Sequence, residues 1–203
     1  MQGEGLKLIA GLGNPGPQHL GNRHNVGAMF LERLCERYHG ELRNESKFSG
    51  LFGSAVIGSS EVKLLFPTTF MNNSGKSVAA VCRFFKIEPQ QMLVAYDEID
   101  FDVGTTRFKA GGGHGGHNGI RDIINALGGQ NAFYRLRIGV GHPGHKSMVS
   151  GHVLSDPSKA EAEIILGDIE RAVGVLPEAV SGNWEEAMRL LHTTPESPAE
   201  KNR

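Results

Sequence analysis

The sequence predicts an α/β protein: a single domain in which helices flank a twisted, mixed central sheet. Short apolar segments of strand length alternate along the chain with longer segments whose apolar residues recur at helical spacing. The 203 residues suffice for one substantial core, and no linker-like segment divides them. We therefore expect one domain over residues 1–192 and a polar, disordered tail over residues 193–203.

The first strand and the first helix are expected at the start of the chain. Residues 6–12 are mostly apolar and are followed by the turn-forming sequence GNPGP at residues 13–17. Residues 26–38 carry apolar side chains at helical spacing, and Gly40 is placed to end that helix.

A hairpin and a second helix follow. Residues 51–57 and 62–66 have the pattern of two strands, joined across Gly58-Ser59-Ser60. A helix then begins near Ser74, and Pro89 prevents it from continuing far.

The second half of the chain continues the alternation. Residues 92–96 and 134–140 form apolar strands, and residues 105–109 form a short one. Residues 111–119 contain six glycines in nine positions and lead into a helix over residues 120–127. The last two expected helices cover residues 158–173 and 183–191.

Composition favours an ordinary globular protein of a reducing compartment. No apolar run approaches the roughly 18 residues that a membrane span needs, and the first residues do not have the pattern of a signal peptide. The two cysteines, Cys35 and Cys82, fall at apolar positions of expected helices, which favours free thiols. We therefore expect a cytoplasmic protein without a membrane partner.

Charge is unevenly distributed along the chain. The net charge is −1, yet residues 101–150 hold six basic against two acidic residues, and residues 151–203 hold five basic against ten acidic ones. This pattern fits a local basic surface that meets phosphates, and it also fits an ordinary solvated asymmetry.

Two phosphate-binding motifs are incomplete. Residues 11–16 (GLGNPG) match the glycine spacing of a dinucleotide-binding turn, but prolines flank the third glycine and the helix starts about ten residues later. Residues 75–77 (GKS) resemble the end of a P-loop, but the glycine required five positions earlier is Phe70. We expect no nucleotide cofactor.

Metal and covalent chemistry are also disfavoured. The spaced pairs His114/His117 and His142/His145 have no helical scaffold, so we expect no metal. The serine-hydrolase motif Gly-x-Ser-x-Gly is absent, and both cysteines lie on apolar helix faces. In a hydrolase with this sequence, the nucleophile would be a water molecule activated by a general base.

His24 and Asp97 are the candidates for acid–base chemistry. His24 lies where a loop enters the first helix, and the positive end of the helix dipole favours the neutral imidazole that a base must be. Asp97 ends a buried strand, where a carboxylate needs a partner, and a histidine across a cleft would both serve as that partner and be oriented by it. A surface histidine and a plain turn aspartate are the alternatives.

Two asparagines border the same expected cleft. Asn72 enters the second helix and can offer its amide to an oxygen that acquires negative charge, although it or Ser74 can equally be a helix cap. Asn118 starts the helix after the glycine-rich loop, as a cap or as a polar contact to a ligand. The basic residues on the strands beside this loop can contact phosphates: Arg107, Lys109 and Arg137.

Four groups of segments, taken together, are similar to one family. They are residues 11–16 with 23–27 (RHNVG), 67–72 (PTTFMN) with 74–76 (SGK), 97–100 (DEID) with 111–119, and 135–139 (RLRIG) with 141–144 (GHPG). In this order and spacing they resemble the bacterial peptidyl-tRNA hydrolases, and the resemblance extends from about residue 6 to residue 154.

The resemblance implies a monomeric cytoplasmic enzyme that recycles tRNA from peptidyl-tRNA released prematurely by ribosomes, with no cofactor. His24 would activate water, and Asp97 would stabilise its working form. Asn14 would help to distinguish blocked from free aminoacyl groups. Asn72 and Asn118 would hold the peptide, the terminal adenosine and the water, with Phe70 lining the same site.

The resemblance also implies how tRNA is held. Arg107, Lys109 and Arg137 would meet acceptor-stem phosphates. The family usually has tyrosine where this sequence has His19, so the tRNA contact made there is expected to differ. The acidic last quarter of the chain carries little of the resemblance.

Two other functions remain open on sequence grounds. A nucleoside phosphorylase would use the glycine-rich loop for phosphate, and its turnover would depend on phosphate. An RNA-binding module would use the histidine and asparagines only to contact ribose, and it would bind tRNA without cleaving an ester.

Overall fold

A computed structural model describes residues 4–193, and over these residues the chain folds around one seven-stranded sheet. The strand order is β2-β3-β4-β1-β5-β7-β6. Parallel pairing joins β1 to β4 and β5, and β5 to β7, whereas the outer pairs are antiparallel, so the sheet is mixed as predicted. The strands are β1 Leu8–Gly11, β2 Glu41–Glu45, β3 Gly50–Ile57, β4 Ser60–Pro67, β5 Met92–Glu98, β6 Thr106–Ala110 and β7 Tyr134–Gly139.

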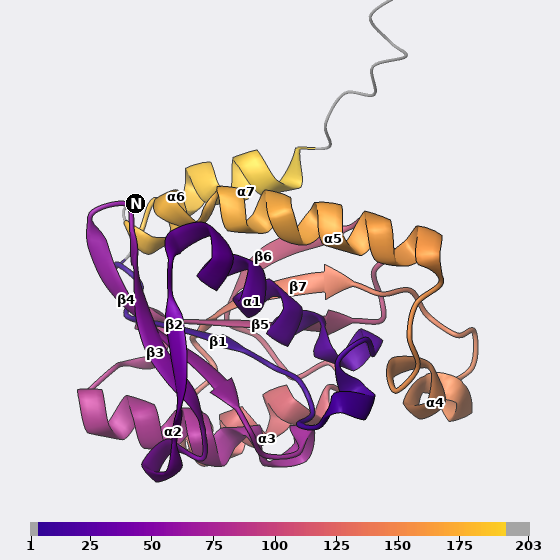
Figure 1. Cartoon of the computed structure of the whole chain (residues 1–203), viewed down its shortest axis with the longest axis horizontal. Coiled ribbons are helices and arrows are strands. Elements are labelled where there is room, and N and C mark those ends of the chain that lie inside the picture. The colour runs from indigo at the N-terminus through magenta and orange to yellow at the C-terminus, as the bar shows by residue number, and fades with distance from the viewer. Residues whose placement is uncertain (1–3, 194–203) are drawn as a thin grey trace, which may run out of the picture.

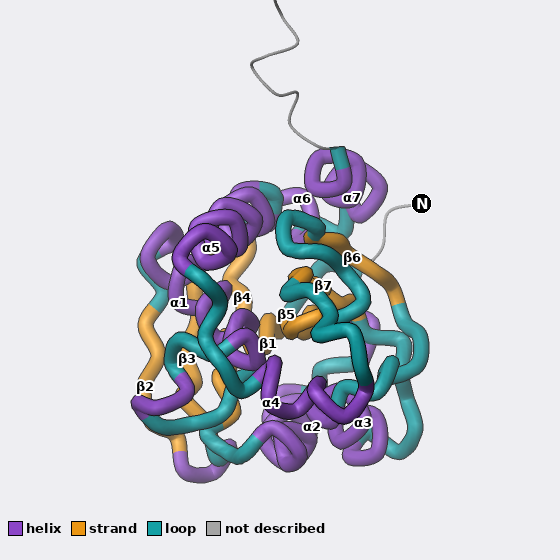
Figure 2. Tube along the Cα trace, turned by 90° about the vertical axis from the view of Figure 1, so that its right-hand side faces the viewer, coloured by secondary structure: helices purple, strands orange, loops and turns teal. Residues whose placement is uncertain are grey.

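Helices cover both faces of this sheet (Figure 1). They are α1 Val26–Tyr38, α2 Ser74–Phe85, α3 Asn118–Ala126, α4 Val149–Val153, α5 Lys159–Gly174, α6 Leu176–Val180 and α7 Trp184–His192. One core lies between the sheet and α1, α5, α6 and α7, and a second lies between the sheet and α2 and α3. Figure 2 shows α5, α6 and α7 above the strands and α2 and α3 below them, with α4 beyond the strand ends.

The central strands are buried because helices pack on both of their faces. Every residue of β1 and of β5 is buried, which explains why both strands are continuously apolar before their polar ends. These two strands are parallel neighbours, so their carboxyl ends lie at the same edge of the sheet. Polar residues that follow β1 and end β5 are thereby brought together.

Two glycines let the first turn of α1 approach this edge. A Cβ atom at Gly27 would lie 2.2 Å from the Ala95 carbonyl oxygen of β5, and one at Gly11 would lie 2.2 Å from the Gly27 carbonyl oxygen. Only residues without a side chain fit these contacts. The close approach places the 3₁₀ turn Arg23–Asn25, immediately before α1, against the end of β5.

Most predicted elements are present, with three differences. His39, rather than Gly40, takes the left-handed conformation that ends α1, while the Gly40 N–H bonds to the Cys35 carbonyl. The edge strand β2 was not predicted, because its residues are largely exposed and lack an alternating apolar pattern. The short helices α4 and α6 were not predicted either, since five residues give too little periodicity.

Other expectations concern the cysteines, the membrane and the tail. Cys35 and Cys82 are free thiols, as predicted. None of the helices within residues 4–193 is long and apolar enough to cross a bilayer. The predicted tail over residues 193–203 lies almost entirely outside the described residues.

Candidate active site

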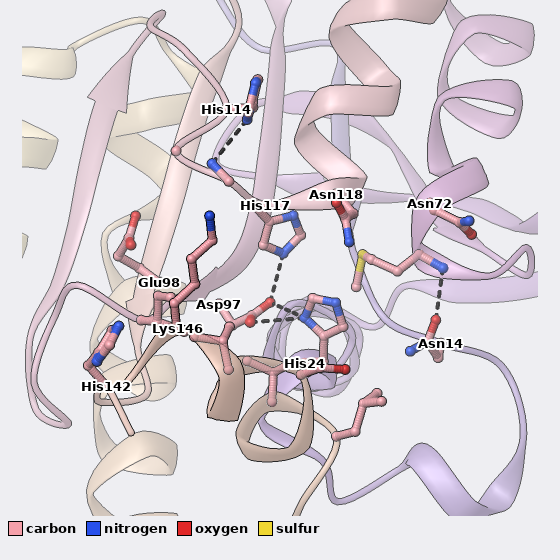
Figure 3. Close-up of a pocket in the computed structure, with 18 of the residues that line it drawn as sticks. Asn14, His24, Asn72, Asp97, Glu98, His114, His117, Asn118, His142 and Lys146 are labelled. Atoms are coloured by element: carbon pink, nitrogen blue, oxygen red, sulfur yellow. Dashed lines mark hydrogen bonds and ion pairs between the residues drawn. The ribbon is translucent and has the colours of Figure 1, made fainter. Parts of the chain in front are cut away.

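A cavity of about 800 Å³ opens at the carboxyl ends of β1 and β5 (Figure 3). Its walls come from the loop after β1, the turn before α1, the turn before α2, the end of β5, the glycine-rich loop and α4. Six residues singled out in the sequence line it: Asn14, His24, Phe70, Asn72, Asp97 and Asn118. The structure therefore brings together the three candidate catalytic residues and three of the candidate binding residues.

Asp97 lies between two histidines at the base of the cavity. The His24 Nδ1 atom is 2.8 Å from Asp97 Oδ1 and 2.9 Å from Oδ2, and the His117 Nε2 atom is 2.8 Å from Oδ1. The Asp97 side chain is only 2% exposed, so both imidazoles bond to a carboxylate that water hardly reaches. His117 was considered in the sequence only as half of a metal-binding pair.

Hydrogen bonding fixes the proton positions on both rings. The His117 Nδ1 atom accepts a bond from the Ile120 backbone N–H at the start of α3, so His117 Nε2 carries the proton that it donates to Asp97. His24 likewise donates from Nδ1 to the carboxylate. In neutral His24 the Nε2 lone pair is then free, which is the state required of a general base.

The two imidazoles and the carboxylate shift the ionisation of this cluster. Burial disfavours the ionised form of Asp97, but His117 and His24 outweigh it and hold the pKa of this carboxyl well below its usual range. Burial would lower the pKa of the His24 imidazole, but the Asp97 charge and hydrogen bond outweigh it and raise that pKa. The helix dipole was expected to favour the neutral ring, whereas the Asp97 carboxylate favours the protonated one.

Three hydrogen bonds hold Asn14. Its backbone N–H donates to Asn25 Oδ1, its carbonyl accepts from Asn25 Nδ2, and its Oδ1 accepts from the Met71 backbone N–H at 2.8 Å. Since the backbone N–H fixes which amide atom is the acceptor, the Asn14 NH₂ group is left to donate into the cavity. The side chain is therefore a preoriented donor near His24.

Asn72 lines the cavity from the 3₁₀ turn Met71–Asn73 before α2, and Asn118 lines it from the first residue of α3. Neither is a helix cap: Asn73 precedes α2 and His117 caps α3. Asn118 Oδ1 accepts from Arg121 at 2.8 Å, which leaves its NH₂ group as a donor that points toward the cavity in Figure 3. Phe70, which is 61% exposed, provides an apolar rim beside Asn72.

The glycine-rich loop is held from below by a buried arginine. Arg135 on β7 donates from its guanidinium to the carbonyls of Gly112 and Gly113. A Cβ atom at Gly113, Gly115 or Gly116 would meet no atom within 4 Å, so the loop surface is open to a ligand. The sequence indicates Arg135 only as one of the basic residues of this region and as part of the segment RLRIG.

The predicted phosphate-binding residues lie on β6 and β7 and do not line the cavity. Arg107 pairs directly across the two strands with Arg137, and Lys109 pairs with Arg135, so all four side chains lie on one face. Arg107 and Lys109 are exposed. Arg137 forms an ion pair with Glu98: its Nε and Nη2 atoms lie 2.9 and 2.8 Å from Glu98 Oε2.

His19 also lies away from the cavity. Its Nδ1 atom is 2.9 Å from Asn22 Oδ1, in a turn between β1 and α1. Asn22 in turn donates to Asp156 Oδ1, in the chain segment after α4. The structure therefore places His19 beside the site and not within it.

The ligand atoms of His24, Asp97 and His117 lie within 4.8 Å of one another, close enough to surround a metal ion. Each group already has a hydrogen-bonding partner in this cluster, because both imidazoles donate to the carboxylate. A metal would have to replace the Nδ1 proton of His24 and the Nε2 proton of His117. The arrangement is self-consistent as a hydrogen-bonded acid–base site, and the absence of a metal requirement stays a prediction.

The fold and the cavity together define an α/β protein with an imidazole–carboxylate site, suited to acid–base chemistry at the carboxyl ends of parallel strands. Known proteins assign the family. A family model described as peptidyl-tRNA hydrolase matches residues 8–200. The chain therefore belongs to the peptidyl-tRNA hydrolase family.

Similar proteins agree over nearly the whole chain. The peptidyl-tRNA hydrolase of Pseudomonas paraeruginosa is 52% identical over 188 residues, which cover 93% of this chain and 97% of that protein. The Coxiella burnetii protein of the same name is 52% identical over 189 residues, covering 93% and 98%. A crystal structure of the Acinetobacter baumannii peptidyl-tRNA hydrolase matches with a TM-score of 0.90 at 43% identity, covering 93% of this chain and 95% of that one.

Proposed function

We propose that the chain hydrolyses the ester between a peptide, or an N-blocked aminoacyl group, and the 3′-terminal ribose of tRNA, and so releases tRNA for reuse. One observation carries the proposal: neutral His24 directs a free Nε2 lone pair into an amide-lined cavity while Asp97 fixes its Nδ1 proton. Membership of the peptidyl-tRNA hydrolase family supports this substrate class.

The reaction follows from these positions. His24 Nε2 removes a proton from water as the water oxygen attacks the ester carbonyl, and the imidazolium formed is stabilised by Asp97. The tetrahedral intermediate collapses as the C–O bond to the ribose breaks, and His24 returns the proton to the leaving oxygen. The products are a peptide carboxylic acid and a tRNA with a free 3′ end, and His24 is neutral again.

Asparagine amides would stabilise the charge that develops on the carbonyl oxygen. The Oδ1 atoms of Asn14 and Asn118 accept bonds from Met71 and Arg121, and their NH₂ groups have no acceptor among the described residues, so both are available to substrate. One such donor is typically worth about 10²- to 10³-fold in rate. Asn14 would also contact the blocked amino group, and Asn72 with Phe70 would contact the peptide or the terminal adenosine.

Outside the cavity, Arg107, Lys109 and Arg137 would contact acceptor-stem phosphates, because they share one face at the end of the sheet. His19 would make a weaker contact with tRNA through its free Nε2 atom. The protein would act as a cytoplasmic monomer, without a metal.

The test is the cleavage of N-acetyl-aminoacyl-tRNA by the purified chain, beside unblocked aminoacyl-tRNA, with and without inorganic phosphate and a chelator. We expect cleavage of the blocked ester that is indifferent to phosphate and chelator. Turnover that requires phosphate would indicate a phosphorylase, and tRNA binding without cleavage would indicate an RNA-binding module. Loss of turnover on chelation would overturn the metal-free mechanism.

A further inference from the structure

The segment between β7 and α5 forms a wall of the cavity but has little core of its own. Residues 141–158 contain α4, and Val149, Ser150, Val153 and Leu154 line the cavity. Val153 is the only buried residue between positions 141 and 158. Segments with few buried apolar contacts open locally at low free energy, so the position of this wall depends on its polar attachments.

Arg23 makes the densest of these attachments. Its Nη1 atom donates to Ser155 Oγ at 2.9 Å and to the Asp156 carbonyl at 3.0 Å, with longer contacts to the carbonyls of His152 and Ser155. Its Nη2 atom donates to Glu161 Oε2 at 3.1 Å, at the start of α5. The Arg23 backbone N–H also bonds to the Ser155 carbonyl at 3.1 Å.

These bonds start from the residue that precedes the candidate base. Arg23 and His24 share one 3₁₀ turn, and the Arg23 side chain is only 9% exposed. The other side of the turn is fixed by the bond from His24 to Asp97. One turn therefore holds both the imidazole and the wall that faces it.

We propose that Arg23 is a positioning residue that fixes the α4 wall relative to His24, so that substrate bound in the cavity is aligned with the His24 imidazole. The inference rests on the proposed function of the same cavity. Arginine suits the role because its planar fork of N–H groups can bond to carbonyls on one side and to a carboxylate on the other, which a lysine ammonium cannot span.

Other bonds keep the segment attached when this one is removed. Asn22 Nδ2 donates to Asp156 Oδ1 at 2.9 Å, and His152 Nε2 lies 2.9 Å from the Gly141 carbonyl oxygen. Loss of the Arg23 guanidinium should thus loosen the wall without unfolding the domain. Substrate binding should suffer more than the chemical step, because the bond between His24 and Asp97 does not involve Arg23.

The test compares Arg23→Met and Arg23→Lys with Arg33→Met. Arg33 on α1 is a matched control: it also reaches α5, through Glu170 at 3.6 Å, but it is 39% exposed and does not line the cavity. Two readouts are needed: KM and kcat for N-acetyl-aminoacyl-tRNA over a range of pH, and backbone hydrogen exchange of residues 149–156. The exchange readout does not depend on catalysis, so it decides the structural claim even when the proposed function fails.

For Arg23→Met we expect KM and the exchange rate of residues 149–156 each to rise at least about tenfold, the size expected for losing charge-assisted hydrogen bonds. The acid limb of the pH profile should stay in place, β5 should exchange as before, and Arg23→Lys should be intermediate. Unchanged exchange of residues 149–156, or kinetics equal to those of Arg33→Met, would overturn the proposal. If Arg23→Met does not fold, Ser155→Ala combined with Glu161→Gln removes the Ser155 hydroxyl acceptor and the Glu161 charge, and the same pair of outcomes applies.

Discussion

Replacing Asp97 with asparagine tests how the carboxylate controls His24. The substitution keeps the shape of the side chain but leaves one acceptor where there were two. In the native cluster both Asp97 oxygens lie within 2.9 Å of His24 Nδ1, and Oδ1 also lies 2.8 Å from His117 Nε2. An asparagine that keeps its oxygen at the Oδ1 position, toward His117, places its NH₂ group at the Oδ2 position, where it competes with the oxygen for His24 Nδ1.

That NH₂ group would reverse the tautomer of His24. The ring would accept at Nδ1 and carry its proton on Nε2, where it can no longer remove a proton from water. We expect kcat to fall by about 10²- to 10⁴-fold, the range for losing a general base or its correct tautomer. Affinity for tRNA should be unchanged, because Asp97 is buried and does not reach the basic face of β6 and β7.

The pH profile supplies an independent readout with a definite sign. His24 works when neutral, so kcat/KM rises as pH rises through its pKa. In the native protein the Asp97 charge outweighs burial and places that pKa above its ordinary value of about 6.5. In the variant only burial remains, so the pKa falls and the residual activity should have its acid limb at lower pH.

Single-turnover cleavage of N-acetyl-aminoacyl-tRNA between pH 5 and 9 measures both effects. Asp100→Asn is the matched control, since Asp100 follows the same strand but is exposed. Near-native kcat in Asp97→Asn, or an acid limb that moves to higher pH, would refute the assigned tautomer and the role of the carboxylate.

Two further predictions concern tRNA binding and stability. Lys109→Ala should lower the slope of log Kd against log salt by about one counterion. Arg137→Ala should lower this slope less, because Glu98 already compensates the Arg137 charge. Equal slopes for the native protein and Lys109→Ala would place the tRNA-binding surface elsewhere. Gly27→Ala should destabilise the fold by about 1–3 kcal/mol or more, because its Cβ would collide with a β5 carbonyl. Gly167→Ala, at an open position of α5, should stabilise the fold by about 0.5–1 kcal/mol. Denaturant unfolding measures both changes in stability, and equal changes would contradict the packing at Gly27.

The fold was predictable where local sequence and tertiary packing agree. The buried strands are apolar over all of β1 and over β5 up to Tyr96, and α1 and α2 have clear helical periodicity, so each was located to within a few residues. The edge strand β2 was not predicted, because exposed strand residues need no apolar pattern. Its identity comes from pairing with β3, which is a long-range property.

The sequence predicts which residues form the site, but not all of the hydrogen bonds between them. Asn14, His24 and Asp97 were found because they follow or precede strong elements and match a family pattern. His117 was missed as a partner of Asp97 because its role comes from two contacts at once: its Nδ1 caps α3, which leaves its Nε2 to face the carboxylate. A histidine directly before a helix, in a glycine-rich loop, was the available signal.

The α4 wall was unpredictable for a different reason. Residues 141–158 are largely exposed and have no periodic pattern, so nothing local indicates that they face the cavity. Arg23, more than 100 residues earlier, makes the densest attachment to them, and its partners are mostly backbone carbonyls. Any sequence supplies such carbonyls, and pattern reasoning cannot identify them.

The proposed mechanism depends on the activation of water by His24 in this cavity. The most direct measurement is single-turnover hydrolysis of N-acetyl-aminoacyl-tRNA by His24→Ala at saturating protein, with tRNA binding measured in parallel. We expect a rate at least about 10²-fold below the native rate, with tRNA affinity retained. Hydrolysis close to the native rate would show that a group other than His24 activates the water.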